Sequence, residues 1–214
     1  MHRLQSLCLA ALLGTMACQS ESTSFSAAAP STPMAKQAST AARTPRFLRP
    51  APNAPTIATP AVSFYAKRGV TRQVLMLYHA PPGETDSTVF VRFKVGAKSL
   101  LARPNGSRIA PGDSVRITLT LVDPDALIVD FQPAGLRFDP REPAELRMSF
   151  AETDPDVSGD GTVNRQDTRL TRMLKIWREE TITAPWMTLP SDLFIGAHEV
   201  EAPVAGFTRY VVAY

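Results

Sequence analysis

Cysteine is scarce in this chain. Its 214 residues include two, Cys8 and Cys18, and only three histidines. Cys8 lies inside an apolar N-terminal run, so removal of that run leaves Cys18 alone and excludes a disulfide within the mature chain. The sequence also lacks the G-x-S-x-G, H-E-x-x-H and phosphate-loop patterns of common hydrolases and nucleotide-binding proteins. These absences predict a protein that is not an enzyme.

The part of the sequence from residue 61 onward has no excess of either charge. The whole sequence has 23 basic and 20 acidic residues, but positions 1–60 hold five of the basic residues and one acidic residue. Positions 61–214 therefore carry 18 basic and 19 acidic side chains. The isoelectric point of about 9.1 belongs to the N-terminal part. We expect no nucleic-acid binding by the folded part.

The N-terminus has the pattern of an export signal. Arg3 precedes an apolar run, Leu7 to Met16, that is too short to span a bilayer. The following stretch, GTMAC at 14–18, resembles the lipobox of bacterial lipoproteins. The resemblance implies a signal peptide over 1–17, cleavage before Cys18, a diacylglycerol thioether on its sulfur and an N-acyl chain such as palmitate. An ordinary secretory signal is the alternative.

The predicted lipid anchor indicates where in the cell the protein lies. Several buried acyl chains hold a protein on a membrane stably. Gln19 stands where lipoproteins retained in the inner membrane have aspartate, which favours the outer membrane of a bacterial cell envelope, on its periplasmic or surface face. Residues 18–61 are mostly Ala, Ser, Thr and Pro, so we predict a disordered tether there.

Residues 62–214 read as one domain of short strands. Apolar and β-branched residues alternate or run in segments such as 74–79, 87–96 and 114–122, and Pro, Gly, Asn and Asp separate these segments. This pattern is typical of antiparallel sheets. The predicted fold is mainly β, an antiparallel β-sandwich with one short helix that follows a calcium-type loop.

Three stretches of this domain resemble the ZU-type β-sandwich domain of ankyrins and netrin receptors. They are APGDSVRITLTLV, VDFQPAGLRFDPREPAELRMSF and EVEAPVAGFTRYVVAY. The matching positions are Phe131, Pro133, Gly135, Leu136, Phe138, Pro143, Ala144, Leu146, Phe207, Thr208, Tyr210 and Val211. The family's positions here are structural, so the resemblance implies a fold and no activity.

The stretch DVSGDGTVNRQD, residues 156–167, has oxygen-bearing side chains at the spacing of a calcium loop. Such a loop supplies ligands at fixed steps and needs a glycine at its sharp turn, here Gly161. The predicted calcium ligands, the last in the twelfth position, are Asp156, Ser158, Asp160, Thr162 through its carbonyl, Asn164 and Asp167. Val163 is expected to pack inward. Asn164 also suits the N-cap of a short helix that runs to about Met173.

This loop resembles a single dockerin-type, EF-hand-like repeat, since Asp167 takes the place of the EF-hand glutamate. It lies in a predicted insertion at 152–173. No second repeat follows, so docking to a cohesin is not expected. The alternative is a solvated Asp-Gly turn without a metal.

The predicted function is a membrane-anchored lipoprotein whose sandwich is a non-enzymatic binding or scaffold module, with calcium in a structural role. A surface protein or a glycan is the partner class we expect besides the membrane. An adhesion or docking module that uses the loop as contact surface, and an unrecognised extracytoplasmic hydrolase, are alternatives. Trp177 and Trp186 suit core packing better than sugar stacking.

Overall fold

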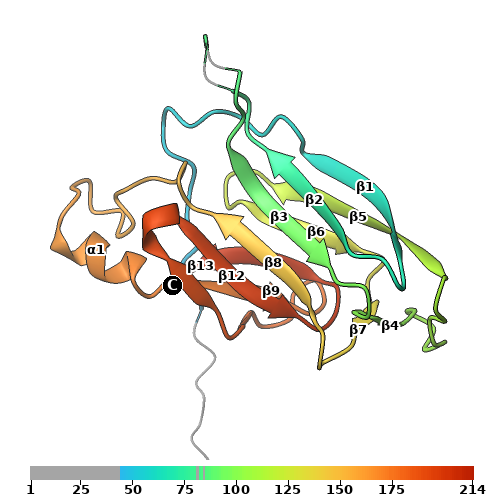
Figure 1. The fold of residues 1–214 in the computed structure, drawn as a ribbon. Helices are drawn as coiled ribbons and strands as arrows, with labels where there is room; N and C mark the ends of the chain where they lie inside the picture. Colours follow the sequence, from blue (N-terminus) through green and yellow to red (C-terminus); the bar gives the residue numbers. More distant parts are fainter. Residues whose placement is uncertain (1–43, 81, 84) are drawn as a thin grey trace, which may run out of the picture. The chain divides into compact units, whose positions relative to one another are not determined.

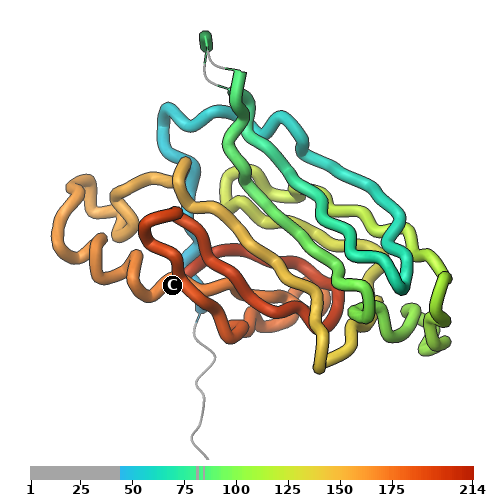
Figure 2. The backbone as a smooth tube through the Cα atoms, in the orientation of Figure 1, coloured from blue at the N-terminus to red at the C-terminus, as the bar shows by residue number. Residues whose placement is uncertain are grey.

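The computed structural model describes residues 44–80, 82–83 and 85–214. Two antiparallel sheets lie face to face in this part of the chain (Figures 1 and 2). The six-stranded sheet has, in spatial order, β1 (Ala61–Lys67), β5 (Ser114–Asp123), β6 (Ile128–Gln132), β13 (Arg209–Ala213), β9 (Lys175–Glu179) and β10 (Met187–Thr188). The predicted mainly β fold is confirmed.

The five-stranded sheet has β11 (Asp192–Phe194), β12 (Glu199–Val204), β8 (Ala144–Ser149), β3 (Val89–Val95) and β2 (Arg72–Leu77), in that order. A small third sheet pairs β4 (Leu100–Ala102) with β7 (Arg137–Phe138). The helical elements are α1 (Arg165–Thr171) and a 3₁₀ turn, η1 (Ile195–Ala197). In the part of the chain that is described, no helix is long and apolar enough to cross a membrane.

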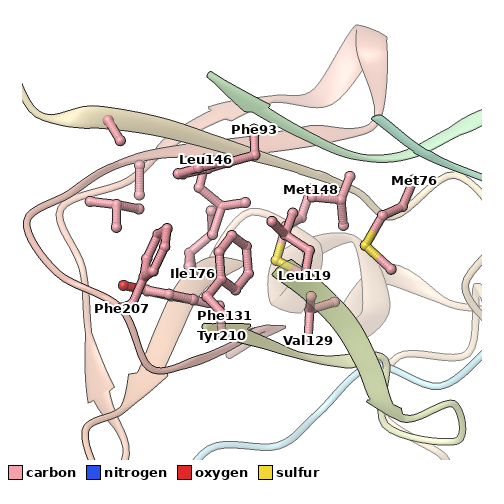
Figure 3. Close-up of a cluster of buried hydrophobic side chains, with 14 of the residues drawn as sticks. Met76, Phe93, Leu119, Val129, Phe131, Leu146, Met148, Ile176, Phe207 and Tyr210 are labelled. Carbon is pink, nitrogen blue, oxygen red and sulfur yellow. The ribbon is translucent and has the colours of Figure 1, made fainter. Parts of the chain in front are cut away.

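The core fills the space between the two large sheets. Alternate residues of each strand point to opposite faces, and the inward set is apolar. Phe93 of β3 packs against Phe131 of β6 and Phe207, with ring centroids 5.2 and 5.6 Å apart (Figure 3). Tyr210 of β13 closes this cluster against Phe131 at 5.0 Å. Burial of these large rings supplies a major part of the stabilisation.

A second apolar cluster lies on the outer face of the six-stranded sheet. Val211 and Ala213 alternate with the inward-facing Tyr210 along β13, so they face outward. Trp177 of β9 is buried beside them, and its indole N–H donates to the Ala213 carbonyl at 3.1 Å. Trp186 is half-buried and packs edge-on against Phe47 at 5.3 Å. Both tryptophans therefore take part in packing.

Residues 46–59, here called the N-terminal strap, are bound to the sandwich. Leu48 is 4% exposed, and its N–H donates to the Val212 carbonyl. Arg46 and Tyr214 exchange two backbone hydrogen bonds of 3.1 and 3.2 Å. β6 pairs with β13 only at Arg209 and Tyr210, so the strap satisfies β13 backbone groups that β6 leaves free.

The domain thus begins earlier than the expected boundary at residue 62. The strap falls in the segment predicted to be a disordered tether, where Phe47, Leu48 and Ile57 are isolated apolar residues. These residues hold the strap in place because each contacts the sandwich. Ile57, for example, forms an antiparallel β-bridge with Tyr78 and packs against the core. The predicted signal peptide at 1–17, Cys18 and the rest of the predicted tether up to residue 43 lie outside the described residues.

Candidate functional site

The predicted calcium loop connects β8 to β9 at one end of the sandwich, with α1 at its far side (Figure 1). Gly159 and Gly161 have φ angles of +70° and +87°, a conformation that glycine adopts without strain. They let the chain reverse twice within a few residues. The position of Gly161 is the one that the sequence pattern assigned to the sharp turn.

Asp156, the first predicted ligand, lies at the centre of this turn. Its Oδ1 accepts from the Ser158 hydroxyl at 3.1 Å and from the Gly159 and Asp160 N–H groups at 2.9 and 3.2 Å. Its Oδ2 accepts from the Gly161 N–H at 2.6 Å. These bonds bring the backbone around the carboxylate, and Oδ2 keeps capacity for a further partner.

Asp160 organises the second half of the loop. Its Oδ1 accepts from the Thr162 hydroxyl at 2.7 Å and from the Thr162 N–H at 2.9 Å, and these bonds lower the pKa of the carboxyl. The Asn164 amide NH₂ lies between Asp160 Oδ2, at 3.2 Å, and the Thr162 carbonyl, at 3.1 Å. The Asp160 carboxylate and the Thr162 carbonyl, both predicted to supply ligand oxygens, therefore accept from the same NH₂ group of Asn164.

Asn164 and Asp167 form the cap of α1. The Asn164 side chain accepts from the Gln166 N–H at 2.6 Å, and Asp167 Oδ2 accepts from the Asn164 N–H at 2.7 Å. This reciprocal pair is a capping box. The predicted N-cap is confirmed, although α1 ends at Thr171, two residues before the expected end. Met173 lies outside it and is exposed.

Asp167 also closes the loop. Its Oδ1 accepts from the Ser158 N–H at 2.8 Å, so the twelfth position is joined to the third. These backbone bonds, first from Ser158 and then from Asn164, lower the pKa of Asp167. Its charge therefore stabilises the folded loop above the ordinary titration range of a carboxyl, and this contribution is lost as the pH falls below that range through the lowered pKa of Asp167.

Asp167 is a nearly buried anion, only 3% exposed. Among the described residues, no Lys, Arg or His forms an ion pair with Asp156, Asp160 or Asp167. Buried charges in proteins are usually paired or bound to a metal. The backbone N–H groups of Ser158 and Asn164 stabilise the negative charge of Asp167 in place of a cationic side chain.

The loop fits calcium in its donor chemistry. All six predicted ligands offer oxygen, and calcium prefers oxygen ligands with flexible angles. The described residues contain no group of three His, Cys, Asp or Glu side chains placed to hold a metal ion. The carboxylates are turned onto the loop backbone, and the Asn164 oxygen caps α1. Ion binding therefore requires rotation of these side chains, with Asp156, Asp160 and the Thr162 carbonyl as the core of the ligand set.

A cavity of about 340 Å³ lies between α1 and the end of the sandwich. Its wall combines apolar side chains such as Leu48, Phe150 and Leu174 with Asp167 and His198. The His198 ring packs against Phe150 at 5.5 Å. Val163 also borders this cavity, but it is 66% exposed at the surface of the insertion, so the prediction that it packs inward is wrong.

Sequence reasoning missed the residues that hold the loop on the sandwich. The Tyr214 hydroxyl donates to the Val157 carbonyl at 2.9 Å, and the Asp154 N–H donates to the Arg49 carbonyl at 2.8 Å. The Ala51 N–H donates to the Glu152 carbonyl at 2.9 Å. The strap and the C-terminal residue thus bind the start of the loop. The pair Phe47–Leu48, isolated in a tract of small residues, was the available signal.

Acidic residues outside the loop have local partners. Asp123 accepts from the Asp125 and Ala126 N–H groups, both at 3.0 Å, within the β5–β6 turn. Asp139 accepts from the Arg141 N–H at 2.9 Å. Asp130 lies 3.9 Å from Arg209. Each of these contacts stabilises a turn or a strand pair.

Comparison with protein-family models, curated proteins and solved structures finds no match to this chain. The resemblance to ZU-type and dockerin-type sequences therefore stays a prediction. The residues that carry the first resemblance have structural positions: Phe131, Leu136, Phe138 and Phe207 are buried, and Gly135 has a φ of +81°.

Proposed function

We propose that this chain is a bacterial envelope lipoprotein whose β-sandwich is a non-enzymatic binding or scaffold module, stabilised by calcium in the 156–167 loop. The observation that carries the calcium part is the buried, ionised Asp167, which has no cationic partner among the described residues. It lies in a loop where oxygens of Asp160 and Thr162 converge on the Asn164 amide. Calcium supplies positive charge to this loop and performs no chemistry.

The ion's role is to order the connection between β8 and β9. A ligand that binds only the folded state stabilises it by about 2.7 kcal/mol at a hundredfold excess over its dissociation constant. Calcium at millimolar concentration is expected to raise the melting temperature and to release or absorb heat in calorimetry. Magnesium, which demands a stricter geometry, is expected to do so less.

Asp156→Ala and Asp160→Ala test this proposal, with Asp123→Ala as the matched control. Asp123 also accepts backbone N–H groups in a turn, but it lies outside the loop. All three variants should lose some stability without calcium. Only the first two should lose the calcium increment. Absence of both heat and a melting shift in the wild type would reject the calcium site.

The anchor rests on Cys18 and the preceding GTMA sequence. Cys18→Ser is expected to move the protein from the membrane fraction to the soluble fraction and to abolish labelling by a fatty-acid probe. Cys8→Ser, in the predicted signal peptide, is the matched control and should label as the wild type does. Equal labelling of the wild type and Cys18→Ser would refute lipidation at this residue.

The exposed apolar residues around the 340 Å³ cavity favour a second candidate, a docking module that uses the loop insertion. Val163 is 66% and Ile195 48% exposed at its border. If this function holds, Val163→Asp removes adhesion to the partner surface and leaves melting unchanged. Unchanged adhesion of cells or beads carrying this variant would favour the scaffold role.

A further inference from the structure

Three of the four edges of the two large sheets carry features that prevent pairing with another strand. The edge strands β10 and β11 have only two and three residues. β2 has an irregular register at Met76–Leu77, and the strap covers its end through bonds from Ala58 and Thr59 to the Leu77 carbonyl. Short, irregular and covered edges are known protections against edge-to-edge association.

β1 is the fourth edge, and it lacks these features. It has seven residues in regular register with β5, and no strand or isolated bridge of the described chain pairs with its other side. It contains no proline and no bulge. Figure 1 shows it at the margin of the molecule.

The direction of the free backbone groups follows from the register. Leu121 N–H donates to the Pro60 carbonyl, and Arg68 N–H donates to the Asp113 carbonyl. Hydrogen-bonded pairs alternate in an antiparallel ladder, so Val62, Phe64 and Ala66 bond to β5. The backbone groups of Ala61, Ser63 and Tyr65 face the open edge. Lys67 adds its N–H, while its carbonyl accepts from Val70.

We propose that the β1 edge pairs with the β1 edge of a second copy of this chain, antiparallel and centred on Phe64. A two-fold interface of this kind sets residue i opposite residue 128 − i. Ser63 then lies opposite Tyr65, a pair in which both N–H and both C=O groups are open. Ala61 lies opposite Lys67, whose open N–H can donate to the Ala61 carbonyl. The two six-stranded sheets join into one.

The side chains of β1 are self-complementary in this register. On the outer face a small residue meets a large one, Ser63 with Tyr65 and Ala61 with Lys67. Tyr65 is 65% exposed in the single chain, so it has surface to lose. On the inner face Val62 meets Ala66, and Phe64 meets its own copy. Such cross-strand pairs are the unit of sheet stabilisation.

Charge does not oppose a second copy in this register. Lys67 meets Ala61 and Thr120 of the other copy. Arg116 lies on β5 beside Tyr65 and meets Ser63 and Thr118 of the other copy. The two Lys67 side chains lie at opposite ends of the joined strands, roughly 20 Å apart at about 3.4 Å per residue. That separation exceeds the screening length at physiological salt.

Disulfide trapping tests the register. The full-length chain with Cys8→Ser and Cys18→Ser carries either Ser63→Cys or Tyr65→Cys. In the proposed dimer, residue 63 of one copy lies opposite residue 65 of the other, at a distance that suits a disulfide. When both copies carry the same variant, their cysteines are offset by two residues along the strands and lie too far apart to bond. The equimolar mixture should form disulfide dimers about tenfold faster than either variant alone, because pairing raises the local thiol concentration.

A mixture of Ser63→Cys with Lys67→Cys is the matched control, because these positions are also diagonal in the proposed register. Equal cross-linking rates in the two mixtures would overturn the proposal. A mixture that cross-links no faster than its separate components would do the same.

A proline variant gives a second measurement. Ser63→Pro removes an N–H that faces the open edge and no bond to β5, whereas Ser63→Ala keeps that N–H and loses the same hydroxyl contact to Thr118. By sedimentation equilibrium at about 1 mM, since an interface of this size is weak, Ser63→Ala and the wild type should show dimer. Ser63→Pro should be monomeric with the same far-ultraviolet circular dichroism. Dimer in all three, or in none, contradicts the proposal.

Discussion

The sandwich and the loop insertion at 152–173 satisfy their backbone groups in different ways. In the sandwich, N–H and C=O groups pair across long antiparallel ladders, above a continuous layer of buried aromatic and aliphatic side chains. In the insertion, the carboxylates of Asp156, Asp160 and Asp167 accept the N–H groups, and few apolar side chains are buried.

This difference separates two sources of stability. The sandwich depends on apolar burial, which pH and ions change little. The insertion depends on ionised carboxylates, so it responds to protonation and to cations. We therefore expect mutations in the two regions to differ in size and in their dependence on solution conditions.

Phe131→Ala is expected to give the largest effect. Its ring is fully buried and contacts Phe93, Phe207 and Tyr210. Loss of a buried phenylalanine costs about 3–5 kcal/mol of unfolding free energy, measured by denaturant titration. The surface variant Phe194→Ala, at a ring 41% exposed, is the control and should cost less than about 1 kcal/mol. Similar losses in the two variants would place the core elsewhere.

Leu48→Ala tests whether the strap belongs to the sandwich. The Leu48 side chain is 4% exposed, and its N–H donates to the Val212 carbonyl. We expect a loss of about 2–3 kcal/mol by chemical denaturation, as for other buried leucines. Pro50→Ala, on the same strap, is the control with a smaller change. If Leu48→Ala melts like the wild type, the domain begins near residue 62 after all.

Asn164→Ala is expected to have a smaller effect, confined to the insertion. The variant removes the N-cap of α1, which costs about 1 kcal/mol. Hydrogen exchange of α1 amides should increase while exchange in β5 and β13 stays unchanged. Asn164→Ser restores an oxygen acceptor at the cap and should recover most of the protection. Faster exchange throughout the sandwich would show that the two regions unfold together.

Tyr78→Phe is expected to have the smallest effect, and its sign is informative. The Tyr78 hydroxyl is buried and has no hydrogen-bond partner among the described residues, and burial together with the nearby Glu152 raises its pKa. Removal of an unpaired polar group is neutral or stabilises by up to about 1 kcal/mol. Tyr214→Phe is the contrast, because it removes the bond to the Val157 carbonyl and should destabilise the insertion. A clear loss in Tyr78→Phe would reveal a partner for its hydroxyl.

Much of the local structure was predictable from sequence. Alternation in 114–122 predicted β5, since residue spacing alone assigns side chains to the two faces of a strand. The Asn164 cap was predictable because the capping box spans four residues. The glycine at the sharp turn of the loop was predictable for the same local reason.

The strap, the outer aromatic cluster and the closure of the loop depended on tertiary structure. Phe47 and Leu48 lie in a tract whose composition is typical of disorder, and they become ordered only because β13 offers free backbone groups about 165 residues away in the chain. Trp186 and Phe47 pack together through contacts that no local pattern encodes.

The sequence by itself determined several of the strands and turns, the capped helix and the order of oxygen-bearing residues from Asp156 to Asp167, because each of these depends on neighbours within a few positions. Only the tertiary structure decided that Asp167 is buried, that Val163 is exposed and that no described strand pairs with the outer edge of β1. Burial and strand pairing arise from contacts between distant segments, and the free energy of those contacts cannot be read from local spacing.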